Sequence, residues 1–214
     1  VDALRMVTLG AADVGRFEEA MALGHEAHRR AQASGDRARV SLAINALGCI
    51  YERIGDPWHA ERLLLDALSL AREAGDAKAV FAALNNLTAT LIGAHYLLDG
   101  GAAADEQQAT LQRALPHAEQ ALAMAEALGD RFYLAFVRGN RGELLVHLDR
   151  LAEARADLEA SMGLCRDGGF DAQAWRIGCS LGELRLRERR QAAERLGAYG
   201  FQFTQDRFGV DIAR

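Results

Sequence analysis

A Gly-Asp pair recurs along the chain at regular intervals, and this repeat constrains the fold more than any other feature of the sequence. The pairs stand at Gly35-Asp36, Gly75-Asp76 and Gly129-Asp130. The first interval is 75 − 35 = 40 residues and the second is 129 − 75 = 54, so one period of 40 and an insertion of 14 account for both. A fixed period of this length indicates an array of stacked supersecondary units.

Each Gly-Asp pair ends a segment that has the apolar periodicity of an amphipathic helix. In the common register, small residues recur at two places in this helix, where they allow a neighbouring helix to approach closely. The first place holds Ala20, Ala60, Ala114 and Ala154, and the second holds Ala27, Ala67, Ala121 and Ser161. The preceding segments also align, so each unit is predicted to contain a first helix, a tight turn, a second helix and a glycine stop.

The stretch LGCIYERIGD, residues 47–56, shows how one such unit turns. Gly48 and Tyr51 share the face of the first helix that packs on the second, with Gly48 leaving room for that helix. Gly55 is predicted to end the first helix in a left-handed conformation. Asp56 then caps the second helix, and Pro57 stands in its first turn.

The LGxxY motif, followed by a turn and then by Ala60 and Ala67, resembles the tetratricopeptide repeat in its longer variety of about 40 residues. The resemblance covers nearly the whole chain and implies an all-α fold, a right-handed α-solenoid of about five antiparallel helix hairpins. Thr88, Arg141 and Arg185 depart from the motif. An unrelated antiparallel bundle remains the alternative fold.

The expected repeat domain spans residues 1–196, with units near 1–37, 38–77, 78–130, 131–170 and 171–196. The third unit contains the insertion, which we expect as a flexible loop over residues 97–108 because of its Gly, Asp and Ala content. Residues 197–214 concentrate aromatic side chains with a period closer to 2 than to 3.6. This tail is predicted to be a C-terminal cap or a linker, and a self-association strip is the remaining alternative.

Composition and charge exclude several classes of protein. Two prolines among 214 residues, of which 50% are hydrophobic, favour helices throughout. The net charge of -5 argues against nucleic-acid binding, which needs clustered basic side chains. No apolar run is long enough to cross a membrane, and no signal peptide is evident, so we expect a cytoplasmic protein that binds no membrane.

No motif in the sequence indicates catalysis. Three cysteines without CxxC spacing predict neither a disulfide framework nor a zinc site. His25 and His28 lie one helical turn apart, but a solvated helix face explains them better than a metal site does. We therefore expect no enzyme activity, no catalytic residue, no cofactor and no bound metal.

The first helices of stacked hairpins form the inner wall of the superhelix, and this wall is the predicted binding groove. Asparagines recur there and can bond the backbone of an extended or helical ligand without selecting its side chains. The alternative is that these amides tie neighbouring repeats together. The predicted groove residues are Asn45, Glu52, Asn85, Asn86, Phe136, Asn140, Glu143, Arg176 and Glu183.

The resemblance implies a protein-binding or peptide-binding scaffold, because tetratricopeptide proteins that bind peptides use asparagines on their first helices in this way. Glu52, Glu143 and Glu183 are expected to make the groove acidic, so the predicted partner is a protein or peptide with a basic or neutral face. The resemblance also suggests the sensory or regulatory interaction module of a larger bacterial protein. The alternative function is self-association, in which the partner is a second copy of the chain in a homodimer and there is no separate peptide ligand.

Overall fold

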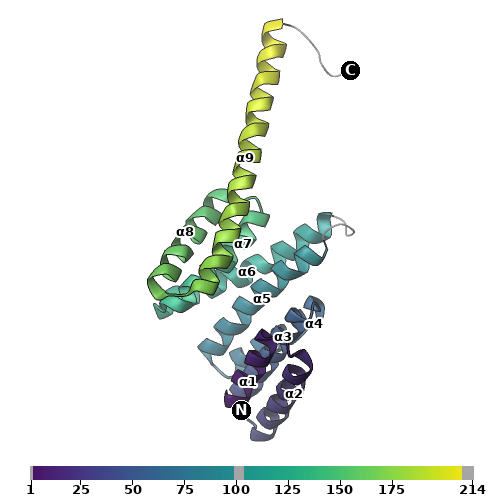
Figure 1. Cartoon of the computed structure of the whole chain (residues 1–214). Coiled ribbons are helices and arrows are strands. Elements are labelled where there is room, and N and C mark those ends of the chain that lie inside the picture. Colours follow the sequence, from purple (N-terminus) through teal and green to yellow (C-terminus); the bar gives the residue numbers. More distant parts are fainter. Residues whose placement is uncertain (1, 99–103, 209–214) are drawn as a thin grey trace.

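The computed structural model describes residues 2–98 and 104–208, and the side chains of residues 197–208 lie outside what it describes. Helices joined by short turns make up nearly all of this part of the chain, and Figure 1 shows them stacked as successive antiparallel hairpins. They are α1 (Asp2–Asp13), α2 (Phe17–Ser34), α3 (Arg37–Arg53), α4 (Pro57–Glu73), α5 (Ala77–Leu97), α6 (Ala104–Leu128), α7 (Arg131–His147), α8 (Leu151–Gly168) and α9 (Asp171–Phe208).

The recurring Gly-Asp pairs end one hairpin and begin the next, as predicted. Gly35, Gly75 and Gly129 have positive φ angles of 67°, 66° and 64°, a conformation that glycine adopts without a steric penalty. The aspartate that follows each glycine caps the next helix. Asp76 is an example: its Oδ1 accepts hydrogen bonds of 3.0 Å from the backbone N–H groups of Lys78 and Ala79.

The turn inside the second hairpin also has its predicted geometry. Gly55 has a φ of 86°, and the Asp56 carboxylate accepts a 3.0 Å hydrogen bond from the backbone N–H of His59. Gly48 allows α3 and α4 to approach closely, because a Cβ there would lie 2.8 Å from Cγ of Leu64. Hydrophobic burial of side chains such as Leu64, worth about 1.5–3 kcal/mol each, then holds the hairpins together.

The pattern of helix contacts gives the array its curvature. Each first helix contacts the first helix of the next hairpin, so that α1, α3, α5, α7 and α9 lie side by side. Within the described part of the chain, the backbones of the second helices α2, α4, α6 and α8 lie further apart, and long side chains bridge them, as where Arg72 of α4 donates to Gln120 of α6 at 2.9 Å. The first helices therefore form the closely packed inner wall and the second helices the outer one, which confirms the all-α helical-repeat solenoid.

The insertion in the third hairpin mainly lengthens its two helices. Helix α5 has 21 residues and α6 has 25, whereas α3 and α4 have 17 each. Helix α6 begins at Ala104, so residues 104–108 of the segment expected as a loop are helical. Acidic residues Asp105 and Glu106 suit a helix N-terminus, which explains this difference. Residues 99–103 lie outside the described residues.

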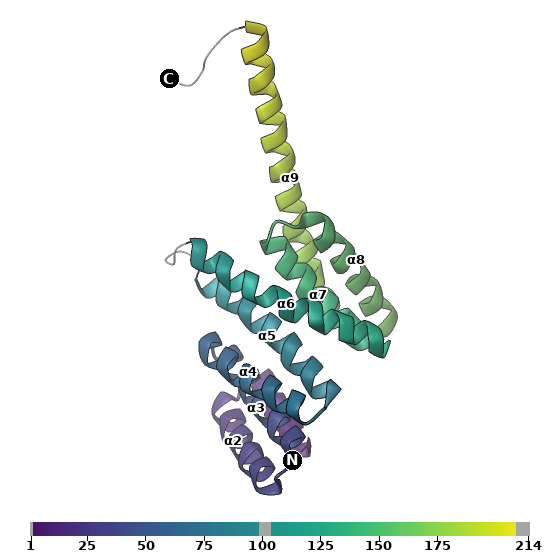
Figure 2. The ribbon, with the colours of Figure 1, turned by 180° about the vertical axis from the view of Figure 1, so that it is seen from behind.

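Helix α9 runs on past residue 196 without a helix end. The aromatic-rich segment up to Phe208 is therefore helical, and its alternation of residue types does not produce a strand. Figures 1 and 2 show the C-terminal half of α9 extending away from the stacked hairpins. Whether residues 197–214 act as a cap or a linker stays a prediction. None of the helices in the described ranges is both apolar enough and long enough to cross a membrane.

Candidate functional site

Two adjoining hollows lie on the inner wall formed by the first helices. The larger, about 500 Å³, is lined by residues of α5, α6, α7 and α9, and the smaller, about 220 Å³, by residues of α3, α5, α7 and α9. Arg176 lines both hollows, which therefore adjoin, and we call the two hollows together the groove. Eight of the nine predicted groove residues line this groove, while Asn45 lines neither hollow and is buried.

The four asparagines form a ladder between successive hairpins. Asn86 Nδ2 donates to Asn45 Oδ1 at 3.2 Å, and Asn140 Nδ2 donates to Asn85 Oδ1 at 2.9 Å. Arg176 continues the ladder by donating to Asn140 Oδ1. These bonds tie neighbouring repeats together, which was the alternative role considered for the amides. Asn85 lines the smaller hollow, and its Nδ2 group donates to none of the described residues.

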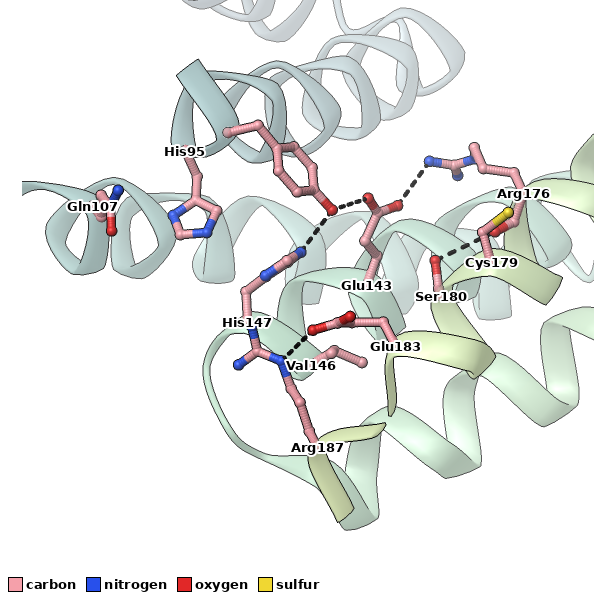
Figure 3. A pocket seen from close by; sticks show the side chains of 11 residues that line it. His95, Gln107, Glu143, Val146, His147, Arg176, Cys179, Ser180, Glu183 and Arg187 are labelled. Carbon is pink, nitrogen blue, oxygen red and sulfur yellow. Dashed lines mark hydrogen bonds and ion pairs between the residues drawn. The ribbon is translucent and has the colours of Figure 1, made fainter. Parts of the chain in front are cut away.

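A second chain of hydrogen bonds crosses the larger hollow (Figure 3). Arg176 donates to Glu143 Oε2 at 3.1 Å, and the Tyr96 hydroxyl donates to Glu143 Oε1 at 3.2 Å. The same hydroxyl lies 2.8 Å from Nε2 of His147. Side chains from α5, α7 and α9 therefore meet in one polar network.

The bonding of Tyr96 fixes the tautomer of His147. Because the hydroxyl gives its only proton to Glu143, it must accept a hydrogen bond from the N–H at Nε2 of His147, which leaves the lone pair on Nδ1. Burial, together with His95 and Arg187, lowers the pKa of His147 to about 4. Partial burial and the neighbouring Glu143 raise the pKa of Tyr96. Both side chains are therefore neutral near pH 7.

Arginines neutralise most of the negative charge of the groove. Glu143 pairs with Arg176, and Glu183 pairs with Arg187 at 2.8 Å. The Glu52 carboxylate has neither a hydrogen bond nor an ion pair with any described residue, and burial raises its pKa. The acidic character expected from three glutamates is thus largely offset, because Arg176 and Arg187 of α9 pair with two of them and the charges of Arg53 and Arg176 lie near Glu52.

His95, Tyr96 and Gln107 also line the groove, although they are not among the groove residues predicted from the sequence. All three belong to the parts of α5 and α6 that are lengthened by the insertion in the third unit. The sequence sign of these residues was the 14-residue insertion that breaks the 40-residue period, because inserted residues in a solenoid project from the stacked hairpins. Arg187 could have been found from its spacing, because it lies four residues after Glu183 on a helix.

The described residues contain no group of three histidine, cysteine or acidic side chains that could hold a metal ion. His25 is exposed, and His28 is half-buried. Cys165 is buried in the core, whereas Cys179 is exposed and lines the larger hollow.

A family model described as tetratricopeptide repeat matches residues 7–73. This range covers most of α1 and the whole of α2, α3 and α4, so it includes the turn between α3 and α4. A comparison with curated proteins finds no match.

Proposed function

We propose that this chain, which carries tetratricopeptide repeats, is a protein-interaction scaffold that binds a peptide segment of its partner along the inner wall. Repeats of this family are in general protein-interaction modules. The observation that carries the proposal is the pair of hollows that adjoin at Arg176 and are lined mainly by the first helices α3, α5, α7 and α9.

The polar groups of the groove suit a peptide backbone. Asn85 offers an amide donor to a carbonyl oxygen, and Glu52 offers an acceptor to an N–H group. Since Glu143 and Glu183 are paired with arginines, only a small net charge faces the ligand. A neutral segment, or one with a single basic side chain opposite Glu52, therefore fits better than a strongly basic one.

The groove is proposed to bind and not to catalyse. Tyr96, His147 and Glu143 hydrogen-bond to one another, so their shared network positions helices α5 and α7. We further propose that the chain is the sensory or regulatory module of a larger bacterial protein. The resemblance supports this role, and the arginine-rich composition, in which Lys78 is the only lysine, supports the bacterial source.

A pair of matched substitutions tests the groove. Ala89 lines the smaller hollow, and Ala160 is exposed on α8 on the outer side of the array. Random dodecapeptides would be selected on the unchanged protein, and their Kd values measured by fluorescence polarisation. Ala89→Arg should fill the hollow and raise Kd at least about tenfold, the equivalent of 1.4 kcal/mol, while Ala160→Arg should leave Kd within about twofold.

Circular dichroism would show that both variants keep the helical content of the unchanged protein. Selection of no binding peptide, or an equal loss of affinity in the two variants, would contradict the proposed groove.

A further inference from the structure

One face of α9 lacks the helix that covers the equivalent face in complete hairpins. In α3, a Cβ on Gly48 would lie 2.8 Å from Cγ of Leu64 in α4. In α7, a Cβ on Gly142 would lie 2.7 Å from Cγ of Leu158 in α8. Gly182 occupies the same repeat position in α9, yet a Cβ there would meet nothing within 4 Å.

An exposed tryptophan lies on the same face as this open glycine. Trp175, Gly178, Gly182 and Arg185 are spaced by three and four residues, so they share one face of α9. Trp175 is 74% exposed, and Arg185 is exposed as well. We call these four residues the Gly182 face. It is separate from the groove, which Arg176, Ser180 and Glu183 line on another side of the same helix.

The positions equivalent to Trp175 contact a second helix in the complete hairpins. The Ser41 hydroxyl donates to the Ala67 carbonyl of α4 at 2.8 Å, and the Ser161 hydroxyl of α8 donates to the Ala135 carbonyl at 2.6 Å. Ser41 and Ala135 thus occupy the repeat position that the exposed Trp175 occupies in α9. The repeat itself therefore indicates that an antiparallel helix covers the Gly182 face.

The sequence period identifies which helix this is. The turns within hairpins have positive φ at Gly15, Gly55 and Asp149, and the next equivalent position, 149 + 40 = 189, falls on Arg189. The glycine stop at 169 recurs at 169 + 40 = 209 in the sequence. Residues 191–208 consequently stand in the sequence place of a second helix, although they continue α9 in a straight line.

A straight α9 cannot cover its own Gly182 face. Each glycine contacts a leucine 16 residues further on, since 64 − 48 = 16 and 158 − 142 = 16, so the partner of Gly182 would be residue 198. At 1.5 Å per residue, position 198 lies about 24 Å away along the helix axis. Folding back would require a left-handed conformation at Arg189, which is unfavourable for a residue other than Gly, Asn or Asp.

We propose that the Gly182 face binds residues 191–208 of a second copy of this chain. The two α9 helices then lie antiparallel across a two-fold axis near Arg190, and each copy both gives and receives the missing helix. In this exchange each hairpin is completed by the other chain across the two-fold axis, so no turn within one chain is needed. It also gives the projecting half of α9, visible in Figures 1 and 2, a surface to pack on.

Sedimentation velocity on the full chain tests the exchange. At about 50 µM, well above the Kd expected for a stable interface, the chain should sediment as a dimer of 2 × 23.2 = 46.4 kDa. Gly182→Glu should yield a monomer, because the new side chain occupies the contact yet meets open space in the monomer. Leu196→Glu should also yield a monomer, because it changes the helix that binds to the Gly182 face of the partner copy. Leu196 is 74% exposed in the projecting half of α9.

Gly163→Glu is the matched control, because Gly163 lies in α8 and a Cβ there also meets nothing within 4 Å. This variant should remain a dimer. A monomeric parent chain would overturn the proposal, whether α9 stays straight or folds back onto its own unit. A dimer that survives either Gly182→Glu or Leu196→Glu would overturn it as well, as would dissociation of the Gly163→Glu control with its helicity intact.

Discussion

Polar side chains on the inner wall hold the first helices at fixed distances from one another. Asn86 bonds to Asn45, and Asn140 bonds to Asn85, across consecutive hairpins. A hydrogen bond of this kind contributes about 0.5–1.5 kcal/mol net, but a partly buried amide left without its partner costs about 1–3 kcal/mol. The ladder therefore specifies the register of the hairpins more than it adds to their stability.

His147 makes the stability of the array depend on pH. Its pKa is lowered from 6.5 to about 4 in the folded chain, so the unfolded chain binds a proton first as the pH falls below 6.5. The free energy of unfolding should therefore decrease between pH 7 and about pH 5, by about 1 kcal/mol from this residue after allowance for its partial exposure. Urea unfolding at both pH values measures the decrease.

His28 and His117 also have lowered pKa values, through burial first and then through neighbouring positive groups, and they act in the same direction. The contribution of His147 is isolated by repeating the measurement on His147→Gln, whose side chain can still donate to Tyr96. This variant should lose less stability on acidification. The same pH dependence in both proteins would show that His147 is not responsible.

At the scale of the helices, close approach at a glycine decides how each hairpin packs. A Cβ on Gly142 would lie 2.7 Å from Cγ of Leu158 and 3.3 Å from its backbone nitrogen. Gly142→Ala should therefore lower the free energy of unfolding by about 1–3 kcal/mol, despite the better helix propensity of alanine. Gly163→Ala, in open space on α8, should raise it by about 0.5–1 kcal/mol. Thermal unfolding of both variants measures these changes. Equal effects of the two substitutions would contradict the role given to Gly142.

Helix ends could be predicted from the sequence because they depend on local chemistry. The glycine stops at Gly35, Gly75 and Gly129 and the cap at Asp56 need only a few neighbouring residues, and all are confirmed. The lengthening of α5 and α6 was not predicted, because the insertion was read as a single loop although its last part has a helix-forming sequence.

At the scale of the whole molecule, the groove residues were placed on one wall by the repeat register alone. Their partners were not predictable in the same way. Arg176 reaches Glu143 from 33 residues away, and this pairing depends on how far one hairpin is rotated against the next. The charge of the groove was therefore overestimated, while its position along α3, α5, α7 and α9 followed from the period.

The proposed ligand binds to the first helices of the curved array. Photo-cross-linking of a selected peptide, followed by mass spectrometry of the linked fragments, would locate it. We expect cross-links to residues that line the two hollows, such as Ala89, Glu143 and Cys179. Cross-links confined to the outer helices α2, α4, α6 and α8 would contradict the proposal.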